Sequence, residues 1–134
     1  MSDMQDLAGK IVVITGGGSG VGRATALALV KTGAIPVLLG RSATPLSEAL
    51  EHISEAGGTG LAVPADVADE AAVQRLATTV EERFGASSVL VNAAGISWGA
   101  PALQMTADRW RMVMDVNVTG TFLCAQAFGQ QMVA

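Results

Sequence analysis

The sequence predicts an α/β fold in which helices cover both faces of a doubly wound parallel sheet. Short apolar runs alternate along the chain with longer segments of helical periodicity. The apolar runs are hydrophobic throughout, as expected for strands that are buried on both faces. A glycine-rich turn, Thr15-Gly16-Gly17-Gly18-Ser19-Gly20-Val21-Gly22, follows the first run and opens the first helix. Together these features favour parallel strands joined by helical crossovers.

Four apolar runs have the length of buried strands, at residues 11–14, 35–39, 61–63 and 89–91. Gly, Pro, Ser or Asp flank each run and favour its termination.

Three helical segments follow the first three strands. Their predicted apolar faces are Val21, Ala24, Thr25, Ala28 and Leu29 in the first, Leu46, Ala49, Leu50 and Ile53 in the second, and Val73, Leu76, Ala77, Val80 and Phe84 in the third. Thr44 with Pro45 is the predicted start of the second helix, and Asp69 is the predicted start of the third. The predicted ends of the three helices are Gly33, Gly57 and Gly85.

The last helical pattern begins near Thr106. Its predicted inward stripe consists of Trp110, Val113, Met114, Asn117, Thr121, Cys124 and Phe128. No capping signal ends it before Ala134, and the fourth strand would be an exposed apolar edge. We therefore expect residues 1–134 to form a single domain, truncated after the fourth strand and its following helix.

Composition excludes several classes of protein. Half of the 134 residues are hydrophobic and 15% are charged, which excludes a disordered polymer. A net charge of -4 and the lack of a Lys/Arg cluster predict no nucleic-acid partner. The apolar runs are too short for a membrane span and the N-terminus is acidic, so we expect no membrane partner and a cytoplasmic location. One cysteine and one histidine give no metal-ligand spacing, so no metal site is predicted.

The glycine-rich turn is suited to bind phosphate. Glycines let the backbone approach a ligand closely, and the free N–H groups and positive dipole end of the following helix attract an anion. The turn therefore predicts a dinucleotide-binding domain, with a tight packing turn as the alternative.

Arg41 lies 19 residues beyond Gly22, where a dinucleotide fold places its ribose-selecting residue. An Asp or Glu would accept hydrogen bonds from the ribose diol, whereas arginine offers charge-assisted donors to a 2′-phosphate. Arg41 with Ser42 therefore favours NADP over NAD as the cofactor. A solvated surface arginine is the alternative.

Three further motifs follow in order: Asp66-Val67, then Asn92-Ala93-Ala94-Gly95, then Asn117. With the T-G-x-x-x-G-x-G turn, they resemble the short-chain dehydrogenase/reductase family over essentially the whole chain. The resemblance implies a Rossmann-like fold. It also implies an oxidoreductase that transfers a hydride between nicotinamide and a small-molecule carbonyl or alcohol.

The resemblance also implies roles for individual residues. It assigns Gly16, Ser19, Gly20, Val21 and Gly22 to the phosphate-bearing backbone of the cofactor. It places Asp66 at the adenine amine and the Val67 backbone beside the ring, although Asp66 could instead start a helix. Asn92, Ala93, Ala94 and Gly95 would follow the cofactor, and Ala93 departs from the family's usual Asn-Asn-Ala-Gly.

Asn117 is expected to face inward on the last helix, where a buried amide needs partners. By resemblance it is the catalytic asparagine that holds a water in a proton relay. An amide that staples the helix to a neighbouring loop is the alternative. Of the remaining candidates, His52 is expected to point toward solvent and Cys124 into the core, while Trp98 would line a pocket or anchor its loop.

The family's acid/base pair cannot be assembled from these residues. Tyrosine is absent, and Lys10 and Lys31 form no Tyr-x-x-x-Lys motif. We therefore expect the N-terminal half of a longer NADP-preferring enzyme, inactive by itself and homo-oligomeric when complete. The alternatives are a noncatalytic standalone NADP-binding module and a nonfunctional fragment.

Overall fold

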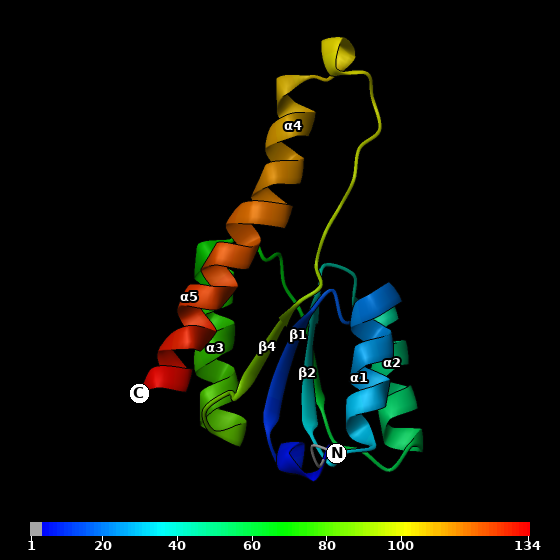
Figure 1. Cartoon of the computed structure of the whole chain (residues 1–134), viewed down its shortest axis with the longest axis vertical. Coiled ribbons are helices and arrows are strands. Elements are labelled where there is room, and N and C mark those ends of the chain that lie inside the picture. Colours follow the sequence, from blue (N-terminus) through cyan, green and yellow to red (C-terminus); the bar gives the residue numbers. More distant parts are fainter. Residues whose placement is uncertain (1–3) are drawn as a thin grey trace.

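The computed structural model describes residues 4–134 and contains a four-stranded parallel sheet with the strand order β3-β2-β1-β4 (Figure 1). The strands are β1 (Ile11–Thr15), β2 (Ile35–Gly40), β3 (Leu61–Pro64) and β4 (Val89–Asn92). All four predicted strands are confirmed, and each continues one residue further, into Thr15, Gly40, Pro64 or Asn92. The apolar pattern therefore located the strands but missed the polar or turn-forming residue at each carboxyl end.

β1 lies in the middle of the sheet, with all five of its residues buried. It pairs in parallel with β2, from Ile11 opposite Ile35, and with β4, from Val12 opposite Val89. Thr15 is thereby aligned with Asn92 of β4, and its Oγ1 accepts a hydrogen bond of 3.0 Å from the Ala94 N–H. The carboxyl ends of β1 and β4, and the loops after them, are therefore held together.

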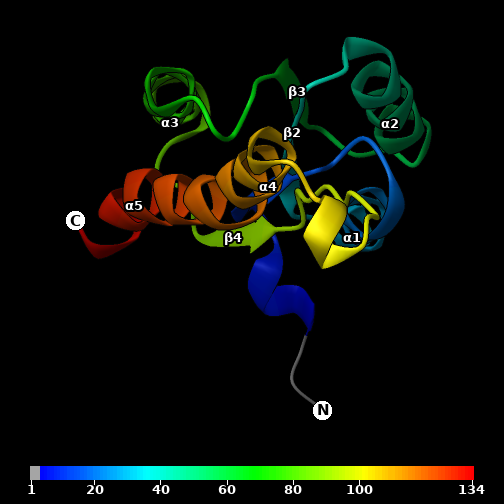
Figure 2. The same cartoon turned by 90° about the horizontal axis from the view of Figure 1, so that it is seen from above.

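Helices cover both faces of the sheet, as predicted (Figure 2). The helical elements are η1 (Met4–Leu7), α1 (Gly20–Val30), α2 (Ala43–Glu55), α3 (Glu70–Phe84), η2 (Ala102–Gln104), α4 (Ala107–Met114), the π-helical turn η3 (Asp115–Thr119) and α5 (Gly120–Val133). α1 and α2 pack on the face that carries Val12 and Ile14, while α3 and α5 pack on the face that carries Val13. The sheet therefore separates two apolar cores.

Most of the predicted helix limits are confirmed. Asp69 caps α3, because its side chain accepts a 3.2 Å hydrogen bond from the Ala72 N–H. Gly33, Gly57 and Gly85 follow the helix ends with φ of 80°, 81° and 94°, values that favour glycine. α2 begins at Ala43, slightly before the predicted Thr44-Pro45 start.

The predicted apolar face of α1 is wrong. Gly22, Ala26 and Val30 are its buried residues, whereas Val21 is 75% exposed. The start of α1 packs directly on the glycine turn, and a Cβ on Gly22 would collide with the Gly16 carbonyl oxygen. Close packing requires small residues on this face, so the positions of larger apolar side chains do not indicate which face is buried.

The predicted inward stripe of the last helix is also only partly correct. Cys124 and Phe128 are fully buried, whereas Asn117 and Thr121 are exposed and Trp110 is 59% exposed. The π-turn η3 interrupts the helix and shifts its phase, since a π-turn contains more residues than an α-turn. α4 also extends past the end of the sheet (Figure 1), and none of its residues is buried.

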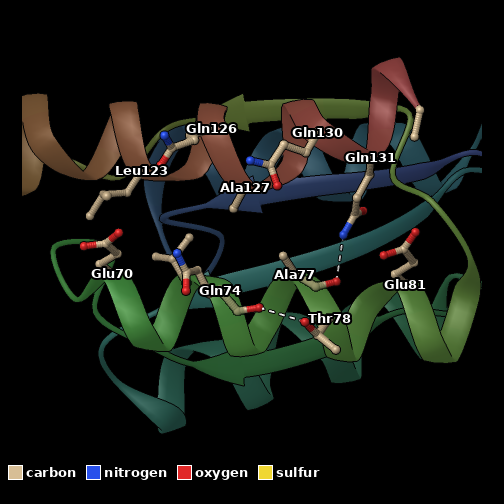
Figure 3. A pocket seen from close by; sticks show the side chains of 12 residues that line it. Glu70, Gln74, Ala77, Thr78, Glu81, Leu123, Gln126, Ala127, Gln130 and Gln131 are labelled. Atoms are coloured by element: carbon tan, nitrogen blue, oxygen red, sulfur yellow. Dashed lines mark hydrogen bonds between the residues drawn. The ribbon is translucent and has the colours of Figure 1, made fainter.

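Gln131 fastens α5 to α3 and to the segment before β4. Its Nε2 donates to the Ala77 carbonyl at 2.8 Å (Figure 3). Its Oε1 accepts from the Ser87 N–H at 3.0 Å and from the Ser87 hydroxyl at 2.9 Å. The three residues are buried, so these bonds satisfy polar groups that water does not reach. A groove of about 460 Å³ lies beside this network, between α3 and α5.

Across residues 4–134, every helix is too short or too polar to cross a lipid bilayer.

We expect Gly22→Ala to destabilise the protein, because the added methyl group must displace the backbone at Gly16. Overpacking of this kind costs about 1–3 kcal/mol, measured as a lower free energy of unfolding in urea. Gly129→Ala is the matched control: nothing lies within 4 Å of the added Cβ, and the change should stabilise α5 by about 0.5–1 kcal/mol. Equal effects of the two substitutions would contradict this account of α1 packing.

Candidate functional site

A cleft of about 180 Å³ lies at the carboxyl ends of the strands. The chain builds β2 and β3 on one side of β1 and then places β4 on the other, so the strand order reverses at β1. Open parallel sheets bind ligands in the crevice at such a reversal. The cleft is lined by Gly16, Gly18, Ser19, Gly40, Arg41, Ser42, Pro45, Leu46, Ala65, Asp66, Val67, Ala94, Gly95, Ile96 and Val116.

The structure brings most of the predicted site residues together in this cleft. Those that line it are Gly16, Ser19, Arg41, Ser42, Asp66, Val67, Ala94 and Gly95; those that do not are Gly20, Val21, Gly22, Asn92, Ala93 and Asn117. Several lining residues that the motifs missed, such as Gly40, Ala65 and Ile96, lie directly beside predicted ones. Extending each motif by one residue would have found them, and would also have found Val116, which directly precedes Asn117.

The glycine turn is enclosed by the backbone that follows β4. Gly16 has a φ of 66°, and a Cβ built there would lie 2.8 Å from the Ala93 carbonyl oxygen. Any side chain at this position would push the two loops apart and would also be strained by its backbone conformation. Glycine therefore allows the turn and the β4 loop to form one continuous wall.

The N-terminus of α1 is free to bind an anion. Ser19 occupies the N-cap position in an extended conformation, but its side chain makes no capping hydrogen bond. The first N–H groups of an α-helix have no partner within the helix. The space around Gly20 is also open, because nothing lies within 4 Å of a Cβ placed there. These features fit a phosphate group, which the N–H groups and the positive end of the dipole would stabilise.

Arg41 and Ser42 stand opposite this helix end, between β2 and α2. Both are exposed, and within residues 4–134 Arg41 takes part in no ion pair. The Ser42 side chain makes no capping bond to α2. The guanidinium and the hydroxyl can therefore both donate hydrogen bonds to a ligand in the cleft.

Two aspartates near the end of β3 have different contacts. Asp66 lines the cleft, and its Oδ1 accepts a 3.0 Å hydrogen bond from the Ala68 N–H within the turn. Asp69 provides the cap of α3. The helix-starting role therefore belongs to Asp69, and Asp66 lies at the cleft.

Asn117 is exposed and does not face inward as predicted; its neighbour Val116 takes the buried position. The Asn117 Oδ1 accepts from the Ile96 N–H at 2.8 Å, and its Nδ2 donates to the Ile96 carbonyl at 2.8 Å. This is the stapling geometry of the alternative interpretation. The amide thus fastens η3 to the segment that leaves β4 along the cleft.

Three other candidate residues lie outside the cleft. Trp98 is 46% exposed, and the Arg109 guanidinium carbon lies 3.8 Å from the centroid of its ring. Cys124 is fully buried, and burial raises the pKa of its thiol from 9.0 to about 11, as expected for a core residue with little thiolate. His52 is exposed, as predicted, and its Nδ1 lies 2.6 Å from the Arg23 Nη2. In the part of the chain that the structure describes, no group of three His, Cys, Asp or Glu residues could hold a metal ion.

The sequence model of the short chain dehydrogenase family matches residues 10–134. The chain therefore belongs to this family of oxidoreductases, and the resemblance seen in its motifs is confirmed. A 3-oxoacyl-[acyl-carrier-protein] reductase from Synechocystis sp. is 37% identical over 131 residues, which cover 97% of this chain and 53% of the reductase. The chain thus spans about half the length of this relative.

Solved structures confirm the Rossmann-like fold. A metagenomic short-chain oxidoreductase in complex with NADP aligns with a TM-score of 0.91 at 34% identity, covering 95% of this chain and 58% of that one. NAD⁺-bound xylitol dehydrogenase aligns with a TM-score of 0.91 at 33% identity, covering 95% and 49%. Relatives of this fold therefore bind either nicotinamide dinucleotide.

We expect Asn117→Ala to loosen the segment that begins at Ile96, because it removes both hydrogen bonds to that residue. Faster exchange of the Ile96 amide and a loss of about 1–2 kcal/mol in unfolding free energy should result. Asn92→Ala is the control, since Asn92 is exposed and makes no side-chain hydrogen bond within residues 4–134. Unchanged exchange at Ile96 would show that the amide does not hold this segment.

Proposed function

We propose that residues 1–134 form the nucleotide-binding domain of an NADP-preferring oxidoreductase that acts on a small-molecule carbonyl or alcohol. The observation that carries this proposal is the single cleft shared by the free N-terminus of α1, Arg41, Asp66 and Gly95. A bound dinucleotide would supply the nicotinamide that gives or accepts the hydride. The residues of this chain bind and orient it.

The residues that line the cleft, together with the turn and loop residues next to them, support a specific division of roles. The turn residues Gly16, Ser19, Gly20, Val21 and Gly22 bind the phosphates through backbone N–H groups and the helix dipole. Asp66 and the Val67 backbone hold the adenine. The backbone of Asn92, Ala93, Ala94 and Gly95 lies along the nicotinamide half, where the glycine turn already meets Ala93.

The preference for NADP depends on Arg41 and Ser42. No carboxylate stands at the end of β2 to accept hydrogen bonds from a ribose diol, and Arg41 offers several N–H donors to a 2′-phosphate. Arginine pairs with phosphate through two parallel hydrogen bonds and remains charged at every working pH.

Arg41→Ala should weaken NADPH binding by about 1–3 kcal/mol, because the 2′-phosphate loses its charge-assisted donors. NADH binding should barely change. Isothermal titration with both dinucleotides measures the difference, and Arg75→Ala, an exposed arginine of α3, controls for the loss of one positive charge. Equal losses for NADPH and NADH would refute the role of Arg41.

Catalysis requires residues that this sequence does not contain. Tyrosine is absent, and Lys10 and Lys31 precede β1 and follow α1, away from the cleft. Asn117 is proposed as the catalytic asparagine by family resemblance. Its side-chain amide is hydrogen-bonded to the Ile96 backbone. The proposed role in holding a water therefore applies to the complete active site, in which the acid/base pair is present.

We expect residues 1–134 alone to give no measurable turnover, since loss of a positioned general acid removes about 10²- to 10⁴-fold of rate. NADPH fluorescence followed with a panel of ketones and aldehydes tests this, and a sample without protein gives the background rate. Steady NADPH oxidation by the 134-residue chain would overturn the expectation.

A homo-oligomer and a cytoplasmic location complete the proposal for the whole protein. Exposed apolar side chains on the last helical segment, including Trp110, Val118, Phe122 and Met132, support assembly through this helix. The net charge of -4 fits a protein without nucleic-acid partners.

A further inference from the structure

The segment that joins β4 to α4 has few contacts beyond its first residues. Ala94, Gly95 and Ile96 line the cleft, and the chain then leaves the sheet and runs beside α4 to η2 at the far end of the molecule (Figure 1). Leu103 is fully exposed, and no residue between 97 and 106 belongs to either apolar core of the described chain. Burial therefore does not fix this part of the chain.

One hydrogen-bonded contact holds the near end of the segment. The Asn117 amide binds both backbone groups of Ile96, as described above. Beyond this point, within residues 4–134, no hydrogen bond joins residues 97–105 to α4, and the bonds from the N–H groups of Gln104 and Met105 stay inside the segment, at the Pro101 carbonyl. A second contact is needed to set the direction in which the segment leaves the cleft.

The stack of Arg109 on Trp98 is that second contact. Trp98 lies two residues after Ile96, and Arg109 belongs to α4. The guanidinium carbon is 3.8 Å from the ring centroid, well within the range of cation–π attraction, for which Trp is the strongest aromatic partner. Asn117 thus holds the segment at Ile96, and Arg109 holds it two residues further on, at Trp98.

We propose that Arg109 is a positioning residue for the far wall of the cleft. By holding Trp98 against α4, it fixes Gly95 and Ile96 where a long ligand must pass. The inference rests on the proposed function, in which a dinucleotide extends from Arg41 and Asp66 to Gly95. A ligand confined to the Arg41 end does not reach this wall and should not depend on Arg109.

Arg111 provides a matched control on the same helix. It is also exposed, but it pairs with Asp108 at 3.3 Å and, among the described residues 4–134, stacks on no aromatic ring. Replacing either arginine with alanine removes one positive charge and one long side chain from α4. Only the Arg109 substitution removes the contact with Trp98.

The test compares the binding of two ligands by isothermal titration: NADPH, and adenosine 2′,5′-bisphosphate, which lacks the nicotinamide half. Arg109→Ala should weaken NADPH binding about two- to fivefold, the value of an exposed cation–π contact, and leave the bisphosphate unchanged. Arg109→Lys should restore part of the loss, and Arg111→Ala should bind both ligands normally. Equal weakening of both ligands, or no weakening of either, would overturn the proposal.

Hydrogen exchange without ligand separates this inference from the proposed function. If the chain binds no dinucleotide, the proposed function fails, but the exchange of the Ile96 amide still reports on the wall. Faster exchange in Arg109→Ala than in Arg111→Ala would support the positioning role. Identical exchange in the two variants would refute it whatever the chain binds.

Discussion

The close approach of the glycine turn to its neighbours determines how the site is built. On one side a Cβ at Gly22 would collide with the Gly16 carbonyl, and on the other a Cβ at Gly16 would reach the Ala93 carbonyl at 2.8 Å. The turn thus packs between α1 and the loop after β4 without any side chain in between. The alignment of Thr15 with Asn92 and its bond to the Ala94 N–H keep that loop in place. The cleft exists because these backbones meet so closely.

Electrostatics then decides which ligand such a cleft can hold. The uncapped N-terminus of α1 and the Arg41 guanidinium place positive potential around the glycine turn. The protein as a whole carries a net charge of -4, so this potential is local. A local cationic site on an acidic protein suits compact anions such as phosphates better than extended polyanions. Asp66 adds an acceptor at one end of the same cleft, which suits a ligand that also carries hydrogen-bond donors.

Local signals in the sequence were sufficient to predict the strands, most helix ends and the motifs that line the cleft. Short-range backbone preferences, which a single sequence displays, determine the strand runs and the helix limits. Examples are the run at Ile11, the Asp69 cap and the helix ends at Gly33, Gly57 and Gly85. The buried face of α1 and the position of Asn117 depend on tertiary contacts. Gly22 is buried because of what it approaches, and Asn117 is exposed because η3 shifts the helical phase. No local signal in the sequence marks Gln131 as buried, and only the juxtaposition of Ala77 and Ser87 shows why an amide is buried there.

The π-turn η3 divides the last helix into two parts under different constraints. α5 contributes Cys124, Phe128 and Gln131 to the packed body of the protein, whereas no residue of α4 is buried. Because α4 contributes no residue to either apolar core, its residues other than Arg109 can be exchanged without repacking the sheet. Apart from Trp98, the segment from 97 to 106 shares this freedom. The architecture is therefore modular: apart from the Trp98–Arg109 contact, the outer region beside the cleft can vary in sequence without altering the packed body that carries the glycine turn.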